Sequence, residues 1–327
     1  MANAEQVKAL IKCHAERDED RFYSVALQVA AEAARKGHAR FARELRDMVE
    51  AARSRSDALP RETEPIPVLR ATGELAGLLS TSFPEVRLNW MSLAENVGQA
   101  LNQLILEQRQ RAELRSYGFE PLKRLLFVGP PGTGKTMAAS AVAGELKLPL
   151  FSIRLDGLIT RFLGETSAKL RLVFDAIGET RGVYFFDEVD ALASDRLAGN
   201  DVGEIRRVLN SFLQFLEEDQ SDSILLAATN HPQLLDTALF RRFESVVRFG
   251  LPSKAEAREL IGDRMARLAL ADDASWDEIT EAAEGLSHSE IVLACDAASK
   301  RAILSNLSSV SADELVSAFA QRRRFKG

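Results

Sequence analysis

The sequence predicts an α/β fold, in which a five-stranded parallel sheet flanked by helices is followed by a helical lid and preceded by a small helical bundle. Short apolar runs alternate with helical periodicity between residues 85 and 250, a pattern typical of βαβ units. The first of these runs ends in a glycine-rich loop that opens a helix, which is the order of a phosphate-binding strand–loop–helix unit.

Composition divides the chain into four segments. Residues 1–55 lack proline and are rich in helix formers, so we expect short amphipathic helices there, with partner or substrate binding as their role. Residues 56–84 hold four prolines and predict a linker with a short helical turn near Leu75–Leu79. Residues 85–250 are expected to form the large sheet subdomain. Only helical periodicity follows, which predicts a lid subdomain over residues 251–327.

Charge, cysteine content and hydropathy exclude several classes of protein. The formal net charge is −6, which gives no electrostatic footprint for nucleic acid. The two cysteines, Cys13 and Cys295, lie far apart in sequence, and this favours a reducing, cytoplasmic location over a disulfide framework. No apolar run has the length of a membrane span, so we expect no membrane segment.

The strongest functional signal is the sequence GPPGTGKT, which begins at Gly129 and matches G-x-x-x-x-G-K-[ST]. Glycines let the backbone turn its N–H groups toward phosphate oxygens, and the following helix N-terminus favours an anion. The lysine can reach the β- and γ-phosphates, and the threonine hydroxyl can ligate Mg²⁺. The chain is therefore predicted to be a P-loop NTPase that binds ATP through Gly129, Pro130, Pro131, Gly132, Thr133, Gly134, Lys135, Thr136 and the adjacent Met137.

Two carboxylates follow the apolar run Val183–Phe186. Asp187 can hold magnesium, and Glu188 can polarise the attacking water. A strand that simply leaves the core at an acidic turn would give the same pattern, but the phosphate loop favours the catalytic interpretation. Asp190 follows closely, and we interpret it as a solvated or capping acid without a catalytic role.

Asn230 follows the apolar run Ile224–Thr229. Parallel sheets deliver functional residues at the carboxyl ends of their strands, so this side chain could hydrogen-bond the γ-phosphate or the water. On its own it could equally be a turn residue before His231 and Pro232.

The order GPPGTGKT, FFDE, TN and a double arginine resembles the AAA branch of AAA+ ATPases, from about residue 85 to the C-terminus. The segment Ala238–Glu244 resembles most the katanin and spastin type. The resemblance implies that Arg241 and Arg242 are arginine fingers, which reach the ATP of a neighbouring subunit. Without it, a basic pair exposed to solvent would be the default interpretation. Fingers acting between subunits imply a homo-oligomer, in this family usually a hexamer.

The resemblance also implies roles for two further segments. The segment Gly285–Ile291 is similar to the opening of the family's lid helix and places Ser289 at the adenosine side, although His288 and Ser289 replace the usual glycine–alanine pair. The segment around Phe162, Leu163 and Gly164 aligns with the family's pore loop, where an aromatic ring grips an extended peptide. Phe162 could instead be a core residue at a helix end.

We therefore expect an ATPase with ATP and Mg²⁺ that forms a ring and remodels, unfolds or threads a protein substrate. One alternative is a regulatory switch that controls a dedicated partner enzyme without threading. A nucleic-acid-acting protein is disfavoured by the net charge, and an ATP-binding scaffold without turnover by the presence of both Asp187 and Glu188.

Overall fold

The computed structural model describes residues 74–324, except for residues 154, 156–162, 193–201, 267, 269 and 271–274. All of these residues belong to the second of two compact units, Leu69–Gly327. The helical bundle predicted over residues 1–55, and the linker as far as residue 73, lie outside the described residues.

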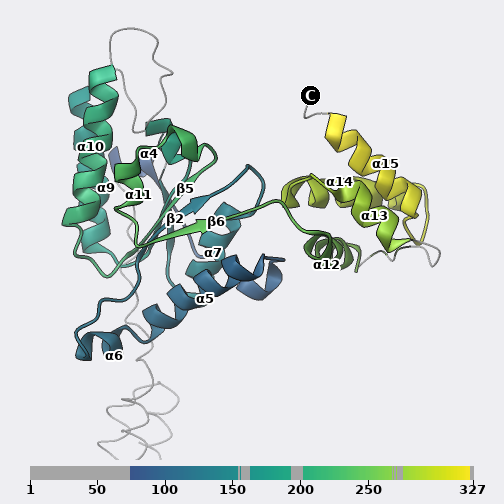
Figure 1. Ribbon diagram of the computed structural model, residues 1–327, viewed down its shortest axis with the longest axis horizontal. Helices are drawn as coiled ribbons and strands as arrows, with labels where there is room; N and C mark the ends of the chain where they lie inside the picture. The colour runs from purple at the N-terminus through teal and green to yellow at the C-terminus, as the bar shows by residue number, and fades with distance from the viewer. Residues whose placement is uncertain are drawn as a thin grey trace, which may run out of the picture. The chain divides into compact units, whose positions relative to one another are not determined.

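A six-stranded sheet organises the large part of the described chain (Figure 1). Its order is β1-β3-β4-β5-β2-β6, and every neighbouring pair is parallel except β1 with β3. β4 and β5 are buried at every residue, as expected for central strands covered on both faces. The strands are β1 (Leu79–Ser82), β2 (Arg124–Val128), β3 (Leu150–Ile153), β4 (Val183–Phe186), β5 (Ile224–Thr229) and β6 (Ser245–Arg248).

The predicted parallel α/β sheet is confirmed, but the expected count of five strands was one short. The additional strand, β1, runs antiparallel along the edge of β3, with Leu79 opposite Ile153 and Ser82 opposite Leu150. It follows the short helix α4 (Glu74–Leu78) in a segment interpreted as linker. Three of its four residues are exposed, so its sequence carries no apolar signal, and pairing with β3 decides its conformation.

Helices cover both faces of the sheet (Figure 1). α9 (Leu163–Glu179) and α10 (Val202–Glu218) lie on one face. Phe186 of β4 packs there between Phe174 and Phe212, at ring-centroid distances of 6.0 and 5.1 Å. The other face is covered by α5 (Glu95–Arg109) and α7 (Lys135–Leu146), with α6 (Arg111–Ser116) following α5. Such aromatic and aliphatic burial is the main stabilisation of the sheet.

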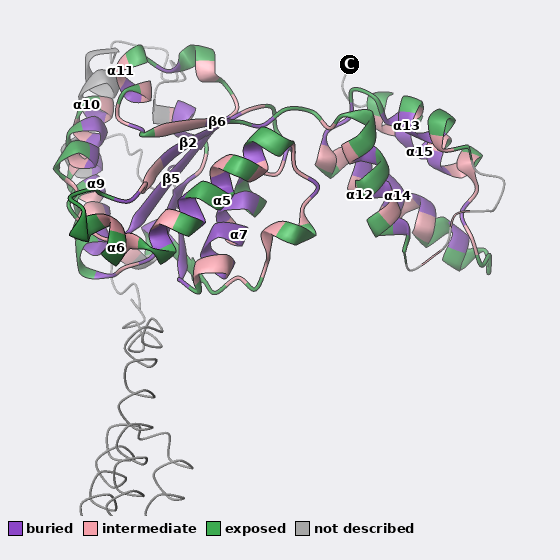
Figure 2. Cartoon of the chain, turned by 60° about the horizontal axis from the view of Figure 1, so that its bottom comes forward, coloured by how far each residue is buried: buried purple, intermediate pink, exposed green. Residues whose placement is uncertain are grey.

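A second core belongs to four helices that follow the sheet: α12 (Lys254–Met265), α13 (Trp276–Ala283), α14 (His288–Leu304) and α15 (Ala312–Arg323). Figure 2 shows buried residues along these helices. Their starting points are specified locally, because Ser253, Ser287 and Ser311 each form a capping box with the glutamate three residues later.

A close approach at Gly144 of α7 gives a stability prediction. A Cβ at this position would clash with the carbonyl oxygen of Val86 and lie 2.9 Å from that of Pro84. Gly144→Ala should therefore destabilise the fold by roughly 1–3 kcal/mol. Gly178 of α9 has no atom within 4 Å of its Cβ position, so Gly178→Ala should stabilise by about 0.5–1 kcal/mol. Urea unfolding of both variants checks this, and equal shifts in the same direction would contradict the close approach.

Candidate active site

Three polar segments meet at one edge of the sheet. β4, β5 and β2 are neighbours and run parallel, so their carboxyl ends lie together. The phosphate loop follows β2, Asp187 and Glu188 follow β4, and Asn230 follows β5. The sheet topology thus assembles residues that lie up to about a hundred positions apart in the sequence into one candidate site.

The backbone of the phosphate loop requires its glycines. Gly132 and Gly134 have φ values of 75° and 98°, in the left-handed region that favours glycine. A Cβ at Gly129 would clash with the carbonyl oxygen of Phe249. Gly134 is the N-cap of α7, which begins at Lys135. The loop therefore leads directly into a helix N-terminus, the arrangement that binds phosphate groups.

Lys135 connects the phosphate loop to the end of β5. Its side chain is 6% exposed, and its Nζ donates to the carbonyl oxygens of Gly129 and Pro130 and to Oδ1 of Asn230, each at 2.8 Å. Burial lowers the pKa of Lys135, while the carboxylates of Asp187, Asp190 and Glu188 oppose this shift. The structure thus places Asn230 at the lysine amine.

Thr136 and Asp187 form the second contact across the site. Thr136 Oγ1 donates to Asp187 Oδ2 at 3.0 Å. Hydroxyl and carboxylate oxygens are hard ligands that suit Mg²⁺, which keeps several waters and binds one or two protein groups beside substrate phosphates. The described residues contain no group of three or more His, Cys, Asp or Glu that could hold a metal on its own. This donor set fits a magnesium ion shared with a nucleotide.

Glu188 is exposed and has a φ of 53°. This left-handed conformation costs a non-glycine residue roughly 1–3 kcal/mol and is concentrated at functional sites. Its backbone N–H donates to Asp187 Oδ1 at 3.0 Å, and its carbonyl accepts from Ala191 N at 2.8 Å. These bonds hold the tight turn that carries both acids out of β4.

Asp190 is a buried acid, so its interpretation as a solvated residue was wrong. Its side chain is 9% exposed, and its Oδ1 accepts from Thr229 Oγ1 at 2.8 Å. Thr229 ends β5 and is fully buried. This pairing could not be predicted from the sequence, because it joins the turn after β4 to the end of β5, which only the fold brings together.

The start of the lid helix α14 lies against the phosphate loop. Ser289 N donates to the carbonyl oxygen of Gly132 at 3.0 Å, and Ser287 Oγ would be 2.7 Å from a Cβ at Gly132. The expected contact of Ser289 with the adenosine side stays a prediction, and the segment before α5 was not found from the sequence. There Met91 Cε would be 3.4 Å from a Cβ at Gly134, and Ser92 Oγ donates to Glu259 Oε2 at 2.8 Å.

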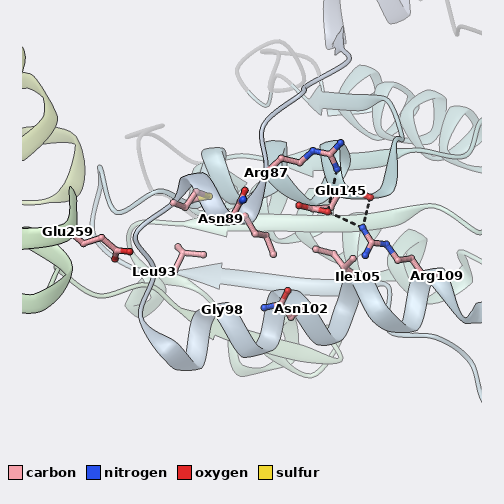
Figure 3. A pocket seen from close by; sticks show the side chains of 11 residues that line it. Arg87, Asn89, Leu93, Gly98, Asn102, Ile105, Arg109, Glu145 and Glu259 are labelled. Carbon is pink, nitrogen blue, oxygen red and sulfur yellow. Dashed lines mark hydrogen bonds and ion pairs between the residues drawn. The ribbon is translucent and has the colours of Figure 1, made fainter. Parts of the chain in front are cut away.

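A groove of about 680 Å³, lined by Met91 among other residues, lies between the 3₁₀ helix η1 (Leu88–Trp90), α5 and α7 (Figure 3). At one end Arg87 and Arg109 both pair with Glu145, at 3.4 and 2.9 Å. The groove contains neither the phosphate loop nor the acids after β4. We therefore assign the candidate active site to the carboxyl edge of the sheet and not to this groove.

The two arginines of the predicted finger pair have different surroundings. The short helix α11 (Thr237–Phe240), capped by the Asp236 carboxylate, ends at Arg241, which is exposed. The side chain of Arg242 is half-buried and pairs with Glu217 of α10 at 2.7 Å. Arg241 is thus presented to solvent, whereas Arg242 is engaged within its own chain.

The predicted pore loop cannot be placed. Phe162 lies outside the described residues, and for Leu163 and Gly164 the structure gives only that they form the first turn of α9. Among the described helices none is long and apolar enough to cross a membrane.

The fold and the site together define a P-loop nucleotide-binding protein of the α/β class. Residues 125–251 match the family described as "ATPase family associated with various cellular activities (AAA)". The chain is 36% identical over 305 residues to the "Uncharacterized AAA family ATPase y4kL" of Sinorhizobium fredii, a match that covers 93% of this chain and 90% of that protein. The chain belongs to the AAA family of ATPases, and it is accordingly an ATP-binding enzyme that hydrolyses ATP.

More distant relatives share only part of their length with the chain. It is 30% identical over 255 residues to the "Proteasome-activating nucleotidase" of Methanothermobacter thermautotrophicus, covering 76% of this chain and 60% of that protein. It is 33% identical over 228 residues to the "ATP-dependent zinc metalloprotease FtsH" of Helicobacter felis, covering 67% and 36%. The crystal structure of the FIGL-1 AAA domain has the same fold, with a TM-score of 0.60, 24% identity and coverage of 74% and 85%.

Proposed function

We propose that this ATPase assembles from identical chains into a ring, most simply a hexamer, that uses ATP hydrolysis to remodel, unfold or thread a protein substrate. The observation that carries the proposal is a pair of hydrogen bonds at the carboxyl ends of the strands. Lys135 donates to Asn230, and Thr136 donates to Asp187. ATP turnover follows from this cluster and the family, and the coupling to a protein is the further step.

Each residue of the cluster has a role that matches its surroundings. The N–H groups of Gly132–Thr136 and the Lys135 amine hold the phosphates, while Thr136 and Asp187 would hold Mg²⁺, which neutralises phosphate charge when bound. Glu188, exposed at the end of its turn, orients and deprotonates the attacking water. Asn230 contacts the γ-phosphate from the end of β5. On the adenosine side, Met137 and Ser289 line the nucleotide.

The neighbouring chain completes the site in this proposal. Arg241 is exposed at the end of α11 and can reach an ATP held by another copy, where its guanidinium stabilises charge on the transferring phosphoryl group. Arg242, paired with Glu217, holds the end of α11 and can join when this partly exposed ion pair opens. A contact that places one surface against a different surface of the next copy gives a ring when the rotation between successive copies closes.

A protein substrate is supported by the relatives' names. One relative is a nucleotidase that activates a proteasome, and another is an ATP-dependent protease. In this chain we propose that Phe162, Leu163 and Gly164 grip the substrate, and that residues 1–55 recruit it in the cytoplasm. The segment Ala238–Glu244 supports placement beside the katanin and spastin type.

Phe162→Ala separates threading from a regulatory switch. An aromatic ring that grips peptide contributes only when substrate is present, so basal ATP turnover should stay within about twofold of wild type. Stimulation of turnover by a permanently unfolded, fluorescently labelled protein should be lost. Phe119→Ala, which removes an exposed aromatic ring outside the predicted pore loop, should retain the stimulation. An unchanged response of Phe162→Ala to the unfolded protein would contradict threading and favour a switch acting on one partner.

A further inference from the structure

A buried hydrogen bond joins the turn after β4 to the end of β5. Asp190 lies in the 3₁₀ helix η2 (Val189–Leu192), directly after the acids Asp187 and Glu188. Its Oδ1 accepts from Thr229 Oγ1 at 2.8 Å, and both side chains are buried, at 9% and 0% exposure. A buried carboxylate is costly unless its oxygens are hydrogen-bonded, so a specific role for this pair is indicated.

The threonine of this pair is a junction of three segments. Its carbonyl oxygen accepts from Gly129 N, the first residue of the phosphate loop, at 3.3 Å. Its Oγ1 also accepts from His231 N at 3.0 Å while donating to Asp190. Asn230, which meets the Lys135 amine, lies between these two bonded residues. Thr229 therefore fixes the backbone before Asn230 through its bond to Gly129 and the backbone after Asn230 through its bond to His231. The orientation of Asn230 depends on both bonds.

The sheet itself does not fix these two ends against each other. The ladder between β4 and β5 pairs Phe186 with Ala227, and Asp187, Glu188 and Asn230 lie beyond that pair. Within the described residues, the Asp190–Thr229 bond spans the gap between the two strand ends after the ladder stops. It joins the turn that carries Glu188 directly to the strand end that carries Asn230, whereas Lys135 and Thr136 contact Asn230 and Asp187 from the phosphate loop.

We infer that Asp190 is a positioning residue for ATP hydrolysis. It acts through Thr229 and keeps Glu188 and Asn230 at the relative positions that hydrolysis requires. The inference rests on the proposed roles of those two residues. It requires a hydrogen-bond acceptor at position 190 and a hydroxyl donor at position 229. It does not require the negative charge of the carboxylate.

The test is a double-mutant cycle on the full chain, read as kcat and as KM for ATP. Asp190→Ala and Thr229→Val should each lower kcat about 10- to 100-fold, the usual effect of losing a group that orients a catalytic residue. Their double variant should be no slower than either one alone, because both remove the same bond. KM should stay within about threefold, since the phosphate-binding groups remain.

Conservative variants distinguish positioning from a merely structural role. Asp190→Asn and Thr229→Ser each keep the hydrogen bond, so kcat should return to within about threefold of wild type. Thr280→Val removes another buried threonine hydroxyl, bonded within α13, and should leave kcat unchanged. Thermal unfolding of each variant verifies folding, and if Asp190→Ala fails to fold, Thr229→Val against Thr229→Ser carries the test.

Three results would overturn the inference. One is wild-type turnover in Asp190→Ala, another is full additivity in the double variant, and the third is an Asp190→Asn variant as slow as Asp190→Ala. Failure of the proposed function gives a different result, because Glu188→Gln would then hydrolyse ATP at the wild-type rate in the same assay.

Discussion

Arg241→Ala should lower steady-state ATP turnover by about 10³-fold or more, while ATP affinity stays close to that of wild type. The expected size follows from the effect of arginine fingers on phosphoryl transfer. In the proposed ring, affinity is preserved because the groups that hold the phosphates, including Lys135, belong to the other chain at the shared site. The measurement is phosphate release at saturating ATP, together with titration of a fluorescent ATP analogue.

The surroundings of the arginine pair supply the controls for this prediction. Arg242→Ala should have a smaller effect, because its guanidinium is paired with Glu217 and is not presented to solvent as Arg241 is. Arg301→Ala, an exposed arginine of α14, should be neutral. An Arg241→Ala enzyme that turns over ATP normally at concentrations where wild type is oligomeric would contradict a role for this residue in catalysis.

Glu188→Gln should bind ATP and hydrolyse it roughly 10²- to 10⁴-fold more slowly, which is the range attributed to a positioned general base. Glutamine preserves the size of the side chain and the hydrogen bonds of the turn, which involve the Glu188 backbone. The amide cannot accept the water proton, so the ATP-bound state should accumulate. Single-turnover hydrolysis and size-exclusion chromatography in ATP measure both consequences.

Glu113→Gln, on the exposed surface of α6, is the matched control. It should match wild type both in single-turnover hydrolysis and in size-exclusion chromatography. Undiminished turnover of Glu188→Gln would remove Glu188 as the base.

The ATP-bound state of Glu188→Gln can also be used to identify the substrate. Proteins that bind the variant in ATP and dissociate in ADP would be identified by mass spectrometry.

Much of the sheet could be predicted because its strands are short apolar runs with clear ends. β4 and β5 follow the apolar runs Val183–Phe186 and Ile224–Thr229 with the same bounds, since buried parallel strands leave a continuous hydrophobic signal. The phosphate loop and the two acids could also be predicted from the sequence, because each directly follows one of the apolar strands along the chain. The place of Asn230 at the carboxyl end of its strand was predicted from the rule that strand ends converge, but its hydrogen bond with Lys135 was not predicted.

The features missed from sequence all depend on contacts between distant segments. β1 has one buried residue in four, so only its pairing with β3 reveals it. Asp190 and Thr229 are 39 positions apart, and the first resembles an ordinary turn residue and the second an ordinary strand residue until the fold brings them together. The contact of Ser92 with Glu259 spans an even longer separation. No periodicity or motif reveals such pairs, because the two residues of each pair are close only in the folded structure and not in the sequence.

The most direct test of the shared active site is a mixing experiment with two inactive variants. Lys135→Ala removes the phosphate-binding amine from one chain, and Arg241→Ala removes the finger from the other. A mixed ring contains interfaces in which an intact Lys135 faces an intact Arg241, about one quarter of the sites by random mixing. Phosphate release should therefore recover to that fraction of wild type when the two proteins are combined. Mixtures that form oligomers yet stay as inactive as their components would show that each chain hydrolyses ATP without its neighbour's arginine.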